Sequence, residues 1–186
     1  MTTATDIPLS GQLTVASGGG TASINLYTGP AANEVARLDF NELLTSLYQG
    51  GTGACTITLI LTKGGVELLR WSSITTSVSG SLTSTSGGAI PYSPFTLTLN
   101  ADGSTTIKPN AVAPFISSSA QGTPLNQITG AGFVTSVDSA AGIKTPLYQA
   151  HGENLTLTLT VSSSANGTTY FNYVLHANVQ IDALGS

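Results

Sequence analysis

The chain has 186 residues, of which 40% are hydrophobic and only 8% are charged, with a formal net charge of −4. A typical soluble domain has roughly 25% charged residues, so Ser, Thr and Gly replace most of the usual surface ions here. The five basic residues are scattered, which excludes the basic patch of a nucleic-acid-binding surface. No apolar run reaches the roughly 18–20 residues of a membrane span, and we expect a single domain over residues 1–186.

Alternation of apolar and polar residues predicts β-strands through much of the first half. Residues 7–15 and 22–26 alternate with period two and are separated by three successive glycines. Residues 55–61 alternate in the same way. Gly64-Gly65 can then form a two-residue turn, and residues 66–71 return. This second pair of segments predicts a β-hairpin.

One segment has the period of a helix instead. Asp39 and Glu42 are spaced as in a capping box. The apolar residues after them fall at i, i+3, i+4, i+7 and i+8, namely Phe40, Leu43, Leu44, Leu47 and Tyr48. We therefore expect one short helix near residues 40–49 that packs its stripe on a sheet.

The middle of the chain predicts another hairpin and some irregular structure. Residues 95–99 and 104–108 flank Asp102-Gly103, a strong turn signal. The Ser/Thr/Gly-rich residues 72–88 fit either a long edge strand or an extended loop. Prolines mark the segment after residue 109 as loop-rich, and further strands are expected near residues 133–137 and 143–150.

The strongest pattern lies near the C-terminus. Residues 155–161 alternate Leu or Val with Thr, and residues 171–181 alternate around large apolar side chains. Asn166-Gly167 between them suits a type I′ turn, so the two segments are predicted to pair as a hairpin. About nine to eleven strands of this kind predict an all-β fold, an antiparallel two-sheet β-sandwich of the jelly-roll type.

No residue set predicts a catalytic, cofactor-binding or metal site. His151 and Glu153 would share a face of a strand, and His176 would approach them if the last two strands pair. A metal or acid–base cluster could begin this way, but it lacks further convergent ligands. Cys55 is better explained as a buried packing residue than as a thiol nucleophile. Trp71 is better explained as a core or interface residue than as a ring on which a sugar stacks. We expect a non-enzymatic protein without a cofactor.

In length, strand pattern and composition the whole chain resembles the small single-jelly-roll major capsid proteins of tailless icosahedral, membrane-containing bacterial and archaeal viruses. The resemblance implies a viral structural (coat) protein of the virion, assembled in the host cytoplasm. Such a subunit self-assembles into an icosahedral shell through edge and loop contacts, with itself and a second, related capsid protein as partners. No motif carries the resemblance, so no site residue is transferred.

The low charge predicts assembly independently of that resemblance. Charged residues keep most soluble proteins apart, and Lys or Glu on edge strands prevents pairing with other chains. Two other classes stay open. A phage tail, fibre, decoration or adhesion module, with an extracellular location, would share Ser/Thr-rich strands. A carbohydrate-binding β-sandwich would need exposed aromatic side chains.

Overall fold

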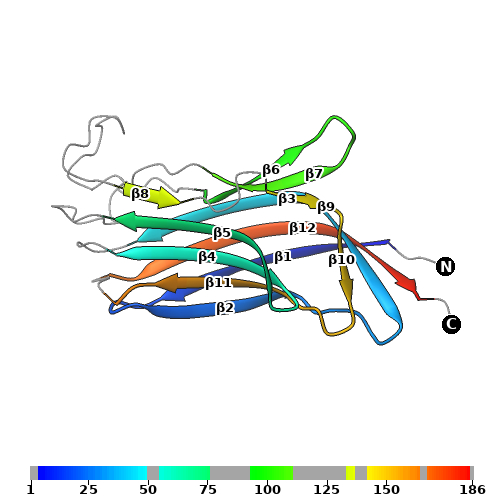
Figure 1. Cartoon of the computed structure of the whole chain (residues 1–186), viewed down its shortest axis with the longest axis horizontal. Helices are drawn as coiled ribbons and strands as arrows, with labels where there is room; N and C mark the ends of the chain where they lie inside the picture. Colours follow the sequence, from blue (N-terminus) through cyan, green and yellow to red (C-terminus); the bar gives the residue numbers. More distant parts are fainter. Residues whose placement is uncertain are drawn as a thin grey trace.

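The computed structural model describes residues 4–49, 55–75, 93–110, 133–136, 142–163 and 167–184. Twelve β-strands form in these segments, and they form no helix (Figure 1). All strand pairs are antiparallel.

The strands belong to three sheets. Sheet A has the order β1-β12-β3-β10, with β1 (Ala4–Val15), β12 (Thr169–Ala183), β3 (Glu34–Gln49) and β10 (Leu147–Ala150). Sheet B has the order β2-β11-β4-β5-β8, with β2 (Gly20–Tyr27), β11 (Leu155–Val161), β4 (Thr56–Lys63), β5 (Val66–Thr75) and β8 (Phe133–Ser136). Sheet C is smaller, with the order β6-β7-β9, formed by β6 (Phe95–Leu99), β7 (Thr105–Pro109) and β9 (Ile143–Thr145).

The chain crosses between sheets A and B in a nested order. β1 and β3 lie in sheet A, whereas β2, β4 and β5 lie in sheet B. After the strands of sheet C and β8, the chain returns to sheet A with β10, to sheet B with β11 and to sheet A with β12. The last strands lie beside the first ones, β12 next to β1 and β11 next to β2. This is the connectivity of a jelly roll, so the predicted fold class is confirmed.

The core lies between sheets A and B, because each sheet turns one apolar face inward. On β11 the side chains of Leu155, Leu157, Leu159 and Val161 are buried, and the threonines between them point outward. On β12 the buried positions are Thr169, Phe171, Tyr173, Leu175, Ala177 and Val179. Trp71 on β5 and Cys55 just before β4 are both buried, which confirms the prediction that they pack in the interior.

The predicted helix near residues 40–49 is wrong, because these residues belong to the long strand β3. Phe40 pairs with Ala177 and Glu42 with His176, so Asn41 is an extra residue in a β-bulge. The bulge reverses which residues face inward: the even-numbered residues do so up to Phe40, and the odd-numbered residues do so from Leu43 onward. The inward positions Phe40, Leu43 and Leu47 are therefore spaced as on one face of a helix, whereas Leu44 of the same pattern points outward and is 60% exposed.

The predicted C-terminal hairpin is also wrong, although both of its arms are strands. β11 pairs with β2 and β4, whereas β12 pairs with β1 and β3. The two strands therefore face each other across the core from opposite sheets. Their apolar faces pack in the same core. Alternation predicts which face of each strand is buried, but it does not show whether two strands pair side by side or face each other from opposite sheets. Asn166 of the expected turn lies outside the described residues.

The other two hairpins are confirmed. β4 and β5 pair through a turn at Gly64 and Gly65, whose φ angles of 55° and 79° suit a type I′ turn. β6 and β7 pair through residues 100–104, and Gly103 has a φ of 80°. The expected strand at residues 143–150 is divided at Pro146 into β9 and β10, which lie in different sheets. Most of the segments 72–88 and 109–124 lies outside the described residues, although residues 72–75 continue β5.

Candidate functional site

The structure does not bring His151 and His176 together. Ala150, which precedes His151, pairs with Val35 of β3, whereas His176 pairs with Glu42 of the same strand. Val35 and Glu42 are seven residues apart along β3, which corresponds to roughly 20 Å at the usual rise per residue. His151 Nδ1 instead lies 2.8 Å from the carbonyl oxygen of Pro30, which accepts its hydrogen bond. A site formed by His151, Glu153 and His176 is therefore excluded.

Glu153 stabilises the turn after β10. Its carboxylate accepts a hydrogen bond of 2.9 Å from the backbone N–H of Ala150 and lies 3.4 Å from Lys63 Nζ. The Lys63 ammonium also donates to the carbonyl oxygen of Tyr148 at 2.8 Å. The amide of Gln149, whose side chain is fully buried, donates to the carbonyl of Glu153 at 2.5 Å. These contacts join β10 to the end of β4 and explain Glu153 as a structural residue.

Glu153→Gln should lower the melting temperature at neutral pH by a few degrees at most, because exposed ion pairs contribute little. The Ala150 N–H and the nearby Lys63 ammonium hold the pKa of Glu153 below its ordinary value of 4.5. A lowered carboxyl pKa stabilises the folded state above 4.5, and this contribution disappears as the pH falls through the lowered pKa. Thermal melts of both proteins from pH 7 to acid should therefore converge. A difference that persists unchanged in acid would contradict this role.

His176 lies on the outer face of sheet A between two carboxylates. Its Nδ1 is 4.0 Å from Asp6 Oδ2 on β1, and its Nε2 is 3.9 Å from Glu42 Oε2 on β3. These distances exceed those of direct hydrogen bonds and metal ligation. Among the described residues, no group of three or more His, Cys, Asp or Glu side chains is arranged to hold a metal ion. The three residues form a partly exposed polar cluster across neighbouring strands.

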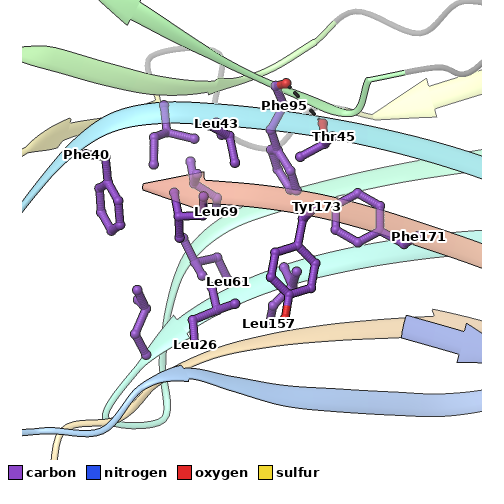
Figure 2. Close-up of a pocket in the computed structure, with 13 residues that line it drawn as sticks. Leu26, Phe40, Leu43, Thr45, Leu61, Leu69, Phe95, Leu157, Phe171 and Tyr173 are labelled. Carbon is purple, nitrogen blue, oxygen red and sulfur yellow. Dashed lines mark hydrogen bonds between the residues drawn. The ribbon is translucent and has the colours of Figure 1, made fainter. Parts of the chain in front are cut away.

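A cavity of about 40 Å³ lies between sheets A and B (Figure 2). Its walls are leucine, isoleucine and phenylalanine side chains with Thr45 and Tyr173. Thr45 donates to the Phe95 carbonyl at 3.3 Å, and burial raises the pKa of Tyr173 above its ordinary value of 10.0. The lining contains no nucleophile–base pair and no charged group. The cavity is a gap in the packing of the core.

A groove of about 430 Å³ separates the β6–β7 hairpin from the outer face of sheet A. Asp39, Asn41 and Asn178 line one side, and Leu97 and Leu99 line the other. Phe40, the aromatic residue at this groove, is only 1% exposed, so it offers no ring for a sugar to stack on. Among the other described aromatic residues, Trp71, Phe95 and Tyr173 are buried, Tyr170 on β12 is partly exposed, and Tyr148 on β10 is 56% exposed.

The outer face of sheet B carries hydroxyl groups that bind one another. Thr21 and Thr160 are 3.2 Å apart, and Ser23 and Thr158 are 2.9 Å apart. Thr58 of β4 lies 3.1 Å from Ser72 of β5. We call this surface the hydroxyl face, which consists of Thr21, Ser23, Thr56, Thr58, Thr62, Ser72, Thr156, Thr158 and Thr160. No Asp, Glu, Lys or Arg occupies an outward position of β2, β11 or β4 between these residues. Ile60 also lies on this face, and Arg70 of β5, which is opposite Ile60, is paired with Glu67.

A similar polar row crosses the outer face of sheet A. Thr14 donates to Gln12 Oε1 at 3.3 Å, and Gln12 Nε2 donates to Asn172 Oδ1 at 2.6 Å. Asn172 Nδ2 in turn donates to Ser46 Oγ at 3.2 Å. The row extends over β1, β12 and β3 without an ion. Beside it, the exposed Leu44 and Val174 occupy paired positions on β3 and β12.

Most basic side chains are neutralised within the chain. The ion pairs are Arg37–Asp39, Lys63–Glu153, Arg70–Glu67 and Lys144–Asp102. The strongest geometry belongs to Arg70 with Glu67, where two hydrogen bonds of 3.0 and 2.6 Å form. The net charge of −4 therefore lies on the residues outside these pairs, and it is small for a surface of this size.

The fold and these surfaces define a jelly-roll β-sandwich without a recognisable chemical centre in its described parts. No protein-family model matches the chain, and no curated protein matches it. Among solved structures, it is similar to the VP2 subviral particle of infectious bursal disease virus, with 14% identity and a TM-score of 0.21. A structure of the Gx strain of the same virus gives 12% identity and a TM-score of 0.20. The matches cover 97% of this chain and 40% of each of those chains. The described residues include no helix long and apolar enough to cross a membrane.

Proposed function

We propose that this protein is a structural subunit of a viral capsid, which assembles with copies of itself and performs no catalysis. The hydroxyl face is the observation that carries the proposal. Burying an ion between subunits is expensive, and burying an unpaired hydroxyl also has a cost. On this face the hydroxyls of Ser23 and Thr158, and of Thr58 and Ser72, already bind each other. The face can therefore remain in water or be covered by a neighbour at little cost.

The jelly roll supports the same proposal at the level of fold. Jelly rolls occur in viral capsid proteins, and they also occur in lectins and in cupins, so the fold alone does not select a function. A lectin needs exposed aromatic side chains and is disfavoured by the burial of Trp71, Phe95 and Tyr173, although Tyr148 is 56% exposed. A tail, fibre or adhesion module would share the hydroxyl-rich surfaces and is the alternative that remains.

We expect the purified protein to associate as its concentration rises, with little dependence on salt. The reason is that most of its basic groups are already paired within the chain and the net charge that remains, −4, is small, so salt has little repulsion to screen between molecules. Sedimentation velocity at low and near-molar salt measures both effects. Electron microscopy of the source particle then shows whether the chain tiles a shell or forms an appendage.

Two results would contradict the capsid proposal. One is a protein that stays monomeric at high concentration and in low salt. The other is specific binding to one member of an oligosaccharide array, which would support the carbohydrate-binding class.

A further inference from the structure

β1 and β2 leave one flank of the sandwich open. They are the outer strands of sheets A and B, and they follow each other through the turn at residues 16–19. Figure 1 shows both of them along the same side of the molecule. Within the described ranges, no strand pairs with the second edge of either one. On the opposite flank, β10 and β8 occupy the outer positions, and the β6–β7 hairpin lies beside β3.

Pro8 shows which backbone groups of β1 face outward. Pro8 pairs with His176 in an unbroken ladder, although proline has no N–H to donate. Its pair must therefore be of the non-hydrogen-bonded kind, in which the backbone groups point away from β12. By the alternation of the ladder, the N–H and C=O groups of Ser10, Gln12 and Thr14 also point to the free edge.

The apolar interior is partly open at the same flank. Ile7 and Leu9 on β1 and Ala22 and Ile24 on β2 face the core, yet they are only half-buried. The corresponding positions one strand further in are much better covered, since Leu175 on β12 is 3% exposed and Leu159 on β11 is 0% exposed. A strip of apolar side chains thus lies between two free sheet edges.

The edge also lacks the usual protection against pairing. Asp6 is the only charged residue on β1 or β2, and Pro8 is the only proline. Both precede the stretch from Ser10 to Thr14, which carries neither a charge nor a bulge. The Gln12 side chain is held on the outer face by Asn172, so it does not cover the edge. Such an edge is a template for another strand.

We propose that this flank binds a second copy of the chain, with β1 pairing antiparallel to the β1 of that copy about a two-fold axis at Gln12. In this register Ser10 of one copy is opposite Thr14 of the other, and Gln12 is opposite Gln12. Every outward N–H and C=O between Ser10 and Thr14 then finds a partner, and the two apolar strips are brought close together. A two-fold contact uses the same patch twice, so the flank must complement itself, and an uncharged strand edge does. The inference deepens the proposed function and rests on it, because it names one of the contacts between subunits.

The test compares Gln12→Pro with Gln12→Ala by sedimentation velocity over a range of concentrations. Both variants lose the side-chain bond to Asn172, but only proline also removes the outward N–H. Proline is tolerated on an edge strand when its nitrogen faces solvent, so both variants should fold with similar melting temperatures. We expect Gln12→Ala to dimerise like the wild type. Gln12→Pro should raise the dissociation constant about tenfold or more, since both central hydrogen bonds are lost.

A second measurement does not depend on the proline variant. At the two-fold axis the Cα atoms of position 12 would be about 5.5 Å apart, within the range of a disulfide. Gln12→Cys should therefore form an intermolecular disulfide under mild oxidation much faster than Thr98→Cys, an exposed control on β6. Ser23→Cys on the edge of sheet B tests pairing through β2 instead. The native Cys55 is buried and should not interfere.

The outcomes separate this inference from the capsid proposal. Rapid cross-linking at position 12, together with a weakened Gln12→Pro dimer, supports the β1 contact. If the wild type associates while Gln12→Pro associates equally well and Gln12→Cys cross-links no faster than the control, the β1 contact is wrong and assembly uses another surface. If the wild type never associates, both proposals fail.

Discussion

Replacing Phe171 by alanine should lower the free energy of unfolding by about 3–5 kcal/mol, the usual range for removing a large aromatic side chain from a core. Phe171 lies on β12 in the middle of sheet A and is fully buried. Its ring stacks on Tyr173 with centroids 6.2 Å apart, and it lines the cavity between the sheets (Figure 2). Alanine would enlarge a gap that already exists, and rigid neighbouring strands can close it only partly.

Chemical denaturation of the wild type, Phe171→Ala and Leu99→Ala measures this effect. Leu99 is 73% exposed at the β6–β7 hairpin, so its loss should change stability by less than about 0.5 kcal/mol. A loss of 3–5 kcal/mol is a large share of the 5–15 kcal/mol that typically stabilises a domain. Similar midpoints for the two variants would show that the interior between sheets A and B is not packed as described.

Gly19→Ala should destabilise the protein by about 2–5 kcal/mol, through backbone strain and a steric clash together. Gly19 lies in the turn between β1 and β2 with a φ of +77°. A Cβ at this position would be 2.5 Å from the carbonyl carbon of Ser162, at the end of β11. Because that neighbour is backbone, it can give way only if β11 moves.

Gly18→Ala is the matched control for this prediction. Gly18 has a φ of +91°, but a Cβ there would meet nothing within 4 Å. It should therefore show the strain alone, about 1–2 kcal/mol. Denaturation midpoints of both variants separate strain from clash. Equal losses at the two positions would mean that the turn does not pack against Ser162.

The sequence correctly predicted those features that depend only on residues close together in the chain. Gly64-Gly65 and Asp102-Gly103 each mark a hairpin that forms, because a tight turn between two strands depends on the φ angles of its own residues. The burial of Trp71 and Cys55 also followed from their places in alternating strands.

The helix prediction failed because a sequence does not show a β-bulge directly. One extra residue, Asn41, turned an alternating strand into a pattern with helical spacing. The partner strand β12 decides this, since it pairs with β3 on both sides of the bulge while the register shifts by one residue. Glu42, which suggested a helix cap, instead lies 3.9 Å from His176.

The candidate contact surface was only partly predictable. The threonine rows of the hydroxyl face were visible as alternation, but their mutual hydrogen bonds depend on which strands become neighbours. Pro8 was an available signal for a free edge, because proline within a strand is confined to edges and bulges. Recognising the open flank required the sheet order as well.

By itself the sequence determined that the chain is made of half-buried strands, which face of each strand is apolar, and that few ions cover its surface. These properties follow from composition and from period-two alternation, which each strand carries alone. Only the tertiary structure decided which strands pair, that β11 and β12 face each other across the core, and that β1 and β2 are left at an open flank. The physical reason is that an apolar face can be buried equally well by many partners. The choice among them depends on packing and connections over the whole chain.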